Sequence, residues 1–176
     1  EESGTEIIVT PDDEYNIDVT IDYDSHTLGI QKSNLSSLKN FNFEIASSRT
    51  FCFLHELELL LENNLIKGGD INNAIVIVEN KIDKRKLSNF AKVFEKNDIQ
   101  ITESGILNNL KLRYKNEAAR HKLLDVIGDL ALIGFPIKGK ITAIKPGHTH
   151  NTNFAKKVRD IIIKDMKTTA PLVDFN

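Results

Sequence analysis

The chain has 176 residues, a formal net charge of −2 and a pI near 6.2, and 40% of its residues are hydrophobic. This length predicts one domain of moderate size, and the charge balance excludes a strongly basic nucleic-acid-binding protein. The single cysteine, Cys52, excludes an internal disulfide and is typical of a reducing compartment, so we expect a cytoplasmic location. Because the sequence begins with Glu1 rather than Met, we expect a fragment or a processed product.

The first half of the chain alternates between strand and helix patterns. Residues 1–14 resemble an arm or linker. The alternation of Ile17, Val19 and Ile21 against polar neighbours then predicts a strand over 15–23. Further along, the same reasoning predicts the following elements: a strand over 41–48, an apolar helix over 50–64 that ends before the glycines of "KGGD", and a buried strand over 73–79.

The second half continues this alternation after a more polar segment. Residues 81–112 are expected to hold a helix over 83–96 with a short strand on each side, and we interpret the stretch of about 77–112 as an inserted βαβ sub-unit. The remaining expected elements are a helix over 116–134, a strand over 137–148, a helix over 151–166 and a linker tail over 167–176. Together these elements predict an α+β fold in which a layer of helices covers a mixed sheet, with the domain itself spanning 15–166.

The helix over 116–134, "NEAARHKLLDVIGDLALIG", carries an unusual polar stripe. His121, Asp125 and Asp129 follow one another at four-residue steps, so at about 100° per residue they lie within roughly 80° of one another. Apolar residues cover most of the remaining circumference. A solvated face is normally wider and richer in Lys and Glu, so this stripe is typical of a binding site.

The spacing of His121 and Asp125 is one that a helix uses to give Zn²⁺ two ligands, because an imidazole nitrogen and a carboxylate then face the same point. Considered alone, such a pair is more often a His–Asp contact on the helix surface than a metal site. Asp129 adds a carboxylate that can orient a further histidine. His148 is the candidate partner, since it follows Pro146 and Gly147 directly after a predicted strand.

Several blocks of the sequence together resemble one enzyme family. The segments "SSRTFCFLHELELL", "NNLIKGGDINNAIVIVE", "RHKLLDVIGDL", "IKGKITAIKPGH" and "NTNFAKKV" are similar, in this order, to the zinc-dependent UDP-(3-O-acyl)-N-acetylglucosamine deacetylase of lipid A biosynthesis. The resemblance extends from about Tyr15 to Lys164. It implies a hydrolase that removes an N-acetyl group from a UDP-linked acylated amino sugar with the help of Zn²⁺.

The resemblance also implies roles for individual residues. His121 and Asp125 would be zinc ligands, His148 the general acid, Asp129 its orienting partner, and Thr50 a hydrogen-bond donor to the oxyanion. The substrate would contact a further set of residues, in which the cations meet phosphates and the apolar side chains meet the acyl chain: Lys122, Lys145, Asp22, Tyr23, Phe51, Leu57, Ile71, Ala74 and Val76.

The resemblance covers only the second half of the family's chain. In the family a preceding domain supplies a Glu as general base and a His as third zinc ligand, so we expect this chain to be inactive alone. The long 81–112 segment resembles the members that are fused to a 3-hydroxyacyl-carrier-protein dehydratase, and the tail "APLVDFN" would lead into that second enzyme.

Three other hypotheses remain open at this point. The chain could be a non-catalytic α+β domain that binds a lipid or a protein partner and has lost its metal. It could also be a different zinc amidohydrolase that uses the same helix pair. The simplest alternative is a domain in which the stripe is a buried polar network.

Overall fold

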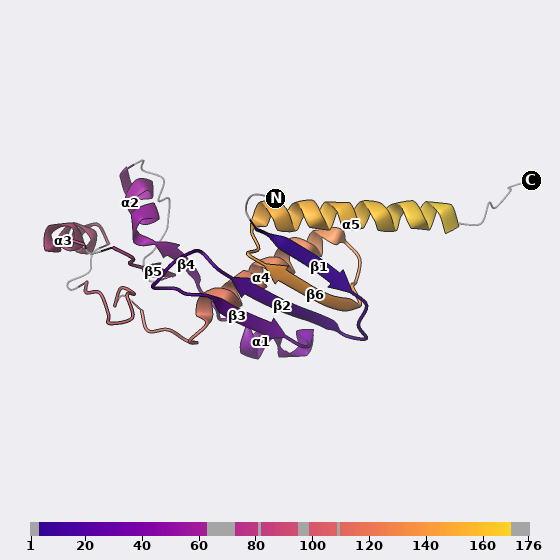
Figure 1. Ribbon diagram of the computed structural model, residues 1–176, viewed down its shortest axis with the longest axis horizontal. Helices are drawn as coiled ribbons and strands as arrows, with labels where there is room; N and C mark the ends of the chain where they lie inside the picture. The colour runs from indigo at the N-terminus through magenta and orange to yellow at the C-terminus, as the bar shows by residue number, and fades with distance from the viewer. Residues whose placement is uncertain (1–3, 63–72, 81, 95–98, 109, 170–176) are drawn as a thin grey trace, which may run out of the picture.

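The protein is described here from a computed structural model, which describes residues 4–62, 73–80, 82–94, 99–108 and 110–169. Its main sheet has the strand order β1-β6-β2-β3 (Figure 1). These strands are β1 (Glu6–Thr10), β2 (Tyr15–Ile21), β3 (Gln31–Leu35) and β6 (Gly139–Ile144). The predicted strands over 15–23 and 137–148 are therefore confirmed as β2 and β6, with slightly narrower bounds.

The two central strands of this sheet, β2 and β6, run parallel, whereas β1 and β3 pair antiparallel to them at the edges. The register places Ile17 opposite Ile141 and Val19 opposite Ala143, and all four side chains are buried. Their alternation with polar residues sends one face of each strand into the core.

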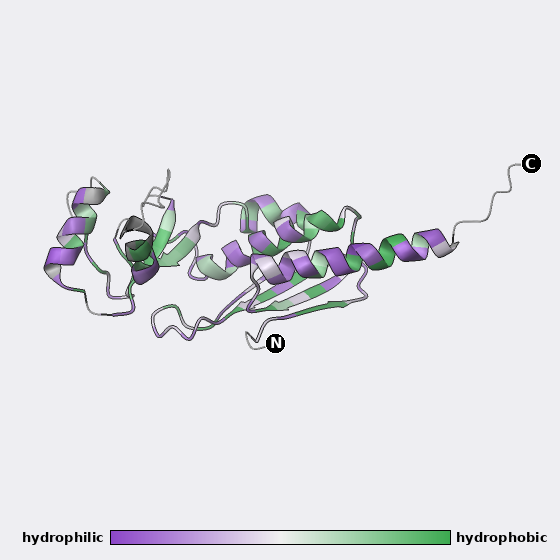
Figure 2. Cartoon of the chain, turned by 90° about the horizontal axis from the view of Figure 1, so that it is seen from above, coloured by the Kyte–Doolittle hydropathy of each residue, from purple (hydrophilic) through white to green (hydrophobic). Residues whose placement is uncertain are grey.

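Two helices, α4 (Glu117–Leu130) and α5 (His148–Thr169), lie side by side over this face of the sheet (Figure 1; Figure 2). The core between the layers is apolar, and its largest members are Ile17, Ile21, Leu35, Ile45, Leu123, Leu130, Ile133 and Ile141. A short 3₁₀ helix, η2 (Ala131–Ile133), extends α4 and ends at Gly134, whose φ of 76° is the left-handed conformation that stops helices. The predicted α+β fold with helices on a sheet is confirmed.

A smaller unit lies at one end of the molecule (Figure 1). Strands β4 (Thr50–Phe53) and β5 (Ala74–Ile77) form a parallel two-stranded sheet, with α2 (Leu54–Glu62) between them in sequence. Helix α3 (Lys84–Val93) begins at Asp83, whose side chain accepts a hydrogen bond from the backbone N–H of Arg85. The unit has its own apolar cluster, made of Leu54, Leu57, Val76, Val78, Phe90, Ile99 and Leu107.

The structure places the βαβ arrangement differently from the sequence prediction. The parallel strand–helix–strand unit is β4–α2–β5, over residues 50–77. The segment predicted to form the insert, about 77–112, contains α3 as expected, but beyond β5 its described residues form only the isolated bridges Ile77–Ile106 and Ile101–Leu107. Part of residues 81–112 and most of the predicted tail 167–176 lie outside the described residues.

Two predictions near the start of this unit are wrong. Residues 41–48 do not form a strand, because the chain there turns through the 3₁₀ helix η1 (Leu38–Asn40) and the single helical turn α1 (Phe41–Glu44). Phe43 is 83% exposed while Ile45 is fully buried, so the apparent alternation does not correspond to one buried face. The predicted helix over 50–64 begins only at Leu54, because residues 50–53 pair with β5.

The expected arm at residues 1–14 is also partly wrong, because Glu6–Thr10 form the edge strand β1. Ile8 and Val9 of this strand are each 41% exposed. At the edge of the sheet, buried and exposed residues therefore do not alternate clearly, and the sequence pattern typical of a strand is weak. The remaining helices agree with their predictions, although α5 begins earlier, at His148.

Candidate functional site

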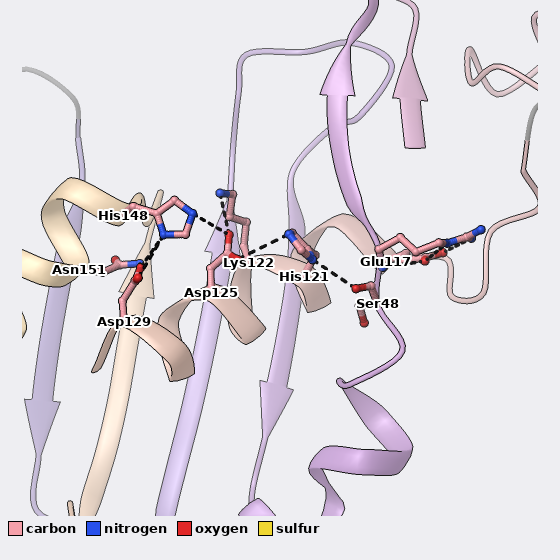
Figure 3. A network of polar contacts seen from close by, with 9 residues as sticks. Ser48, Glu117, His121, Lys122, Asp125, Asp129, His148 and Asn151 are labelled. Carbon is pink, nitrogen blue, oxygen red and sulfur yellow. Dashed lines mark hydrogen bonds and ion pairs between the residues drawn. The ribbon is translucent and has the colours of Figure 1, made fainter. Parts of the chain in front are cut away.

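The polar stripe of α4 is the centre of the candidate site (Figure 3). Leu123, Val126 and Leu130 of this helix are buried against the sheet, so the opposite side of the helix faces away from the core. The stripe there begins one turn earlier than the sequence analysis indicated. Its members are Glu117, His121, Asp125 and Asp129, each four residues after the last.

The geometry of His121 and Asp125 is one that could hold a metal ion between them. The Nε2 atom of His121 lies 3.5 Å from Oδ1 of Asp125, and the two side chains are only 18% and 11% exposed. Ligand distances of about 2.0–2.2 Å put two corners of a tetrahedral zinc site roughly 3.3–3.6 Å apart, which the pair matches. Within the described residues, no third His, Cys, Asp or Glu completes a group that could hold a metal.

The other ring nitrogen of His121 is already engaged. Its Nδ1 atom lies 3.2 Å from the carbonyl oxygen of Ser48. A carbonyl can only accept, so this hydrogen bond requires the proton on Nδ1, and in the neutral ring the lone pair is then on Nε2. The Nε2 atom that faces Asp125 is therefore the one able to bind a metal.

Lys122 adds a cation beside this pair. Its Nζ atom lies 3.0 Å from Oδ2 of Asp125, and its side chain is mostly buried. The ammonium gives the site a positive group that an anionic ligand can approach.

His148 and Asp129 form the second half of the site. The Nδ1 atom of His148 lies 2.9 Å and 3.1 Å from the two oxygens of Asp129, and its Nε2 atom lies 3.8 Å from Oδ2 of Asp125. The amide Nδ2 of Asn151 donates to Asp129 at 2.9 Å. The His148 side chain is 66% exposed. Asp129 holds its Nδ1 atom, so its Nε2 atom faces the site.

Thr50 is exposed at the start of β4, two residues after Ser48. It therefore lies on the segment whose carbonyl contacts His121. No described contact joins Thr50 directly to the stripe.

Lys145 and Asp22 form a separate ion pair at the ends of β6 and β2, with Nζ 3.0 Å from Oδ2. The pKa of Asp22 is lowered by a hydrogen bond from the backbone N–H of Asp24 and by the Lys145 ammonium, and the pKa of Lys145 is raised by its hydrogen bond to Asp22. Lys145 and Asp24 adopt left-handed φ angles of 48° and 53°, which non-glycine residues adopt rarely. Such conformations are often found at functional sites.

An aromatic cluster connects Tyr23, which follows β2, to strand β4 of the smaller unit. The Tyr23 ring meets those of Phe51 and Phe53 edge-to-face, with centroids 5.4 Å and 5.9 Å apart. Partial burial raises the pKa of Tyr23, while Lys122 lowers it and Asp125 raises it, so the ring lies within electrostatic reach of the stripe. The phenol therefore remains protonated at neutral pH and can donate a hydrogen bond.

The described apolar residues assigned to substrate contact are either buried or half-buried. Leu57 and Val76 belong to the buried cluster that includes Phe90, while Ala74 is half-buried and pairs with Thr50 in the β4–β5 register. Ile71 lies outside the described residues. Cys52, next to Phe51, has a pKa of about 11 because burial, followed by the nearby Glu56, disfavours its thiolate. It is therefore a neutral thiol at physiological pH.

Sequence reasoning did not identify four residues of the site: Arg49, Glu117, Ser48 and Asn151. Glu117 was detectable, because it extends the four-residue spacing by one step. Asn151 carries no distinctive signal, because Asn is common at the start of a helix. Ser48 contributes a main-chain carbonyl, which any residue can supply, so its side chain carries no signal.

The fold and the site together define a class: an α+β domain in which a His–Asp pair stands beside a histidine oriented by a carboxylate. The family model of UDP-3-O-acyl N-acetylglycosamine deacetylase matches residues 1–94 and 88–160. The chain belongs to this family.

Individual relatives agree with this assignment. The chain is 46% identical to the bifunctional enzyme LpxC/FabZ of Bacteroides thetaiotaomicron and 44% identical to that of Porphyromonas gingivalis, over 100% and 99% of its length. It is 39% identical over 84% of its length to the UDP-3-O-acyl-N-acetylglucosamine deacetylase of an Anaeromyxobacter species. It spans only 38%, 38% and 41% of these relatives' own lengths.

Proposed function

We propose that this chain supplies part of the active site of a deacetylase that removes the N-acetyl group from UDP-3-O-acyl-N-acetylglucosamine in lipid A biosynthesis. The observation that carries the proposal is the continuous array of His121, Asp125, Asp129 and His148 in a member of this family. Because the chain spans less than half of its relatives, the remaining catalytic groups are proposed to come from outside it.

The proposed cofactor is Zn²⁺, held by His121 and Asp125. The separation of 3.5 Å between their facing atoms and the free lone pair on Nε2 support this assignment. His121 and Asp125 would hold the ion, which would supply Lewis-acid activation of the carbonyl and of water. A third ligand and a general base, a His and a Glu in the family pattern, are proposed to lie in the preceding domain.

His148 is proposed as the general acid. Hydrolysis adds the oxygen of water to the acetyl carbon, breaks the C–N bond and releases acetate, and the departing nitrogen must gain a proton. The Nε2 edge of His148 faces the site while its Nδ1 is held by Asp129, so protonated His148 can donate that proton. Thr50 is proposed to donate a hydrogen bond to the oxyanion that forms on the former carbonyl oxygen.

The proposed substrate contacts follow from charge and polarity. Lys122 and Lys145 supply cations for the sugar and the diphosphate, and Asp22, Tyr23 and Phe51 lie beside them for the uridine end. Leu57, Ala74 and Val76 of the smaller unit, with Ile71, are proposed to contact the acyl chain.

A fused dehydratase is proposed as the partner enzyme, because the two bifunctional relatives match almost the whole chain. We also propose the cytoplasm as the location, since a single cysteine is typical of a reducing compartment. Among the described helices, none is both long and apolar enough to cross a membrane.

The test uses the full-length protein, freed of metal and then reloaded with Zn²⁺. We expect one zinc per protein and release of acetate from the acetylated sugar nucleotide, with both lost on chelation and restored by zinc. His26→Ala, a change of an exposed loop histidine, is the matched control and should retain both. A folded full-length protein that binds no zinc and releases no acetate would instead support a non-catalytic binding domain.

A further inference from the structure

The buried start of the α4 stripe contains an ion pair that the proposed mechanism does not use. Glu117 has a side chain with no exposed surface, and its Oε1 atom lies 2.8 Å from Nε of Arg49. The same carboxylate accepts from Nη2 of Arg49 at 3.0 Å and from the backbone N–H of Arg113 at 2.7 Å. Arg49 also donates to the carbonyl of Lys111 at 2.7 Å.

One further bond connects this ion pair to His121. The backbone N–H of Arg49 donates to Oε1 of Glu117 at 3.1 Å. This N–H belongs to the same peptide group as the carbonyl of Ser48, which accepts from Nδ1 of His121 at 3.2 Å. In a trans peptide the N–H and C=O point in opposite directions, so Glu117 holds one edge of the plane and His121 contacts the other.

Glu117 and His121 are one turn apart on α4, and the peptide group between Ser48 and Arg49 therefore bridges consecutive members of the stripe (Figure 3). A carboxylate on the N–H side polarises the peptide and strengthens its carbonyl as an acceptor. The arrangement favours the His121 tautomer with the proton on Nδ1 and the lone pair on Nε2, and it limits rotation of the ring.

We propose that Glu117 is a positioning residue that acts through the Ser48–Arg49 peptide group to hold the tautomer and orientation of His121 for metal binding. This inference rests on one part of the proposed function, namely that His121 is a metal ligand. The contribution of Arg49 is to fix the carboxylate with its guanidinium, while its backbone N–H transmits the effect.

The first measurement uses the unmodified full-length protein without metal. Histidine-selective ¹⁵N labelling at a pH where the ring is neutral reports which nitrogen carries the proton, and His121→Gln identifies the His121 signals. We expect the proton on Nδ1. A proton found on Nε2 overturns the proposal, and this result needs no variant to fold.

The second measurement is zinc affinity by competition with a chromophoric chelator. Glu117→Leu removes every acceptor for the Arg49 N–H and should weaken zinc binding by about 10–100-fold, the usual effect of losing such a partner. Because loss of one member of a buried pair can prevent folding, the double variant Glu117→Leu/Arg49→Leu removes both charges and should show the same loss.

Two matched controls separate positioning from stability. Arg49→Lys retains the backbone N–H and a positive charge, and should keep near-parental zinc affinity and the Nδ1 proton. Leu35→Ala destabilises the core from β3 and should leave zinc affinity unchanged. Parental affinity and tautomer in the folded double variant overturn the proposal. Both readouts are independent of acetate release, so a protein without deacetylase activity disproves the proposed function and not this inference.

Discussion

The two ends of the α4 stripe differ sharply in their exposure to water. At its start the Glu117 side chain has no exposed surface and accepts four hydrogen bonds. At its other end Asp129 orients His148, whose side chain is 66% exposed. A buried, fully bonded carboxylate cannot exchange its partners readily, whereas an exposed histidine can meet a ligand and exchange protons. One helix therefore supports both a fixed framework and an accessible reactive group.

The difference arises from what covers each end. The start of α4 lies beneath Arg49, which leads into β4, and beneath the backbone of Lys111 and Arg113. At the other end, the first turn of α5 contributes His148 and Asn151. The segments next to the smaller unit thus bury Glu117 at one end of the stripe, whereas α5 leaves His148 exposed to solvent at the other end.

Loss of a ligand should have the largest effect. In the full-length protein, His121→Ala and Asp125→Ala should each abolish stoichiometric zinc and reduce deacetylation to background, because neither remaining side chain can replace the missing ligand. Metal analysis of the purified variants checks this prediction. Either variant with full zinc content would show that the pair is not the metal site.

Removal of the exposed group should have a large effect of a different kind. His148→Ala should retain zinc and lose about 10²–10⁴-fold in kcat, the usual contribution of a positioned general acid. Metal content and turnover measured on the same sample provide the test. Loss of zinc by a correctly folded His148→Ala protein would contradict the separate roles of the two ends.

Glu117, at the buried end of the stripe, should instead determine how the free energy of unfolding changes in acid. Burial alone raises the Glu117 pKa, but the hydrogen bonds from the Arg49 side chain and the Arg113 and Arg49 backbones outweigh it and lower the pKa. Glu117→Gln should reduce the free energy of unfolding at pH 7 by roughly 3–5 kcal/mol, because it leaves Arg49 without its buried partner.

The sign of the pH dependence follows from that lowered pKa. The stabilisation by Glu117 is complete above its unfolded pKa of about 4.3 and is lost as the pH falls through its lower folded pKa. The difference between parent and Glu117→Gln in denaturant unfolding should therefore shrink in acid. A difference that stays constant from pH 7 to pH 3 would mean that folding does not lower the pKa of Glu117.

The smallest effect is expected at Asn151. Asn151→Ala removes one hydrogen bond to the Asp129 carboxylate but leaves the His148–Asp129 contact, so kcat should fall by less than in His148→Ala, with zinc retained. Asp129→Asn provides a double-mutant cycle. If Asn151 acts through Asp129, the two changes together should cost little more than Asp129→Asn alone, whereas additive losses would indicate an independent role.

The sequence was most informative where residues within one helix determine the geometry. Four-residue spacing alone brought His121, Asp125 and Asp129 together, and the structure shows them in one row with His148. Glu117 escaped notice because a carboxylate in the first turn of a helix is ordinary, since it favours the helix dipole. Its burial depends on Arg49, which is 68 positions away in the chain.

The wrong predictions lie where contacts between distant segments decide the structure. Residues 50–53 form a strand because β5 pairs with them, and residues 6–10 do so because β6 pairs with them. Neither partner is adjacent in sequence, so local periodicity cannot reveal the pairing. The Ser48 carbonyl likewise gains its role only from the position of α4.

The strand order of the main sheet has a consequence for the order in which the protein folds. Strand β6 lies between β1 and β2, although it is the last strand of the described chain, and it pairs residue 15 with residue 139. Pairings between such distant segments form slowly, because a long loop must close before they contribute stability. During synthesis, β1 and β2 therefore emerge long before β6, the strand with which both of them pair. His148 lies four residues beyond β6, so its contact with Asp129 joins the two helices that flank this strand in the sequence.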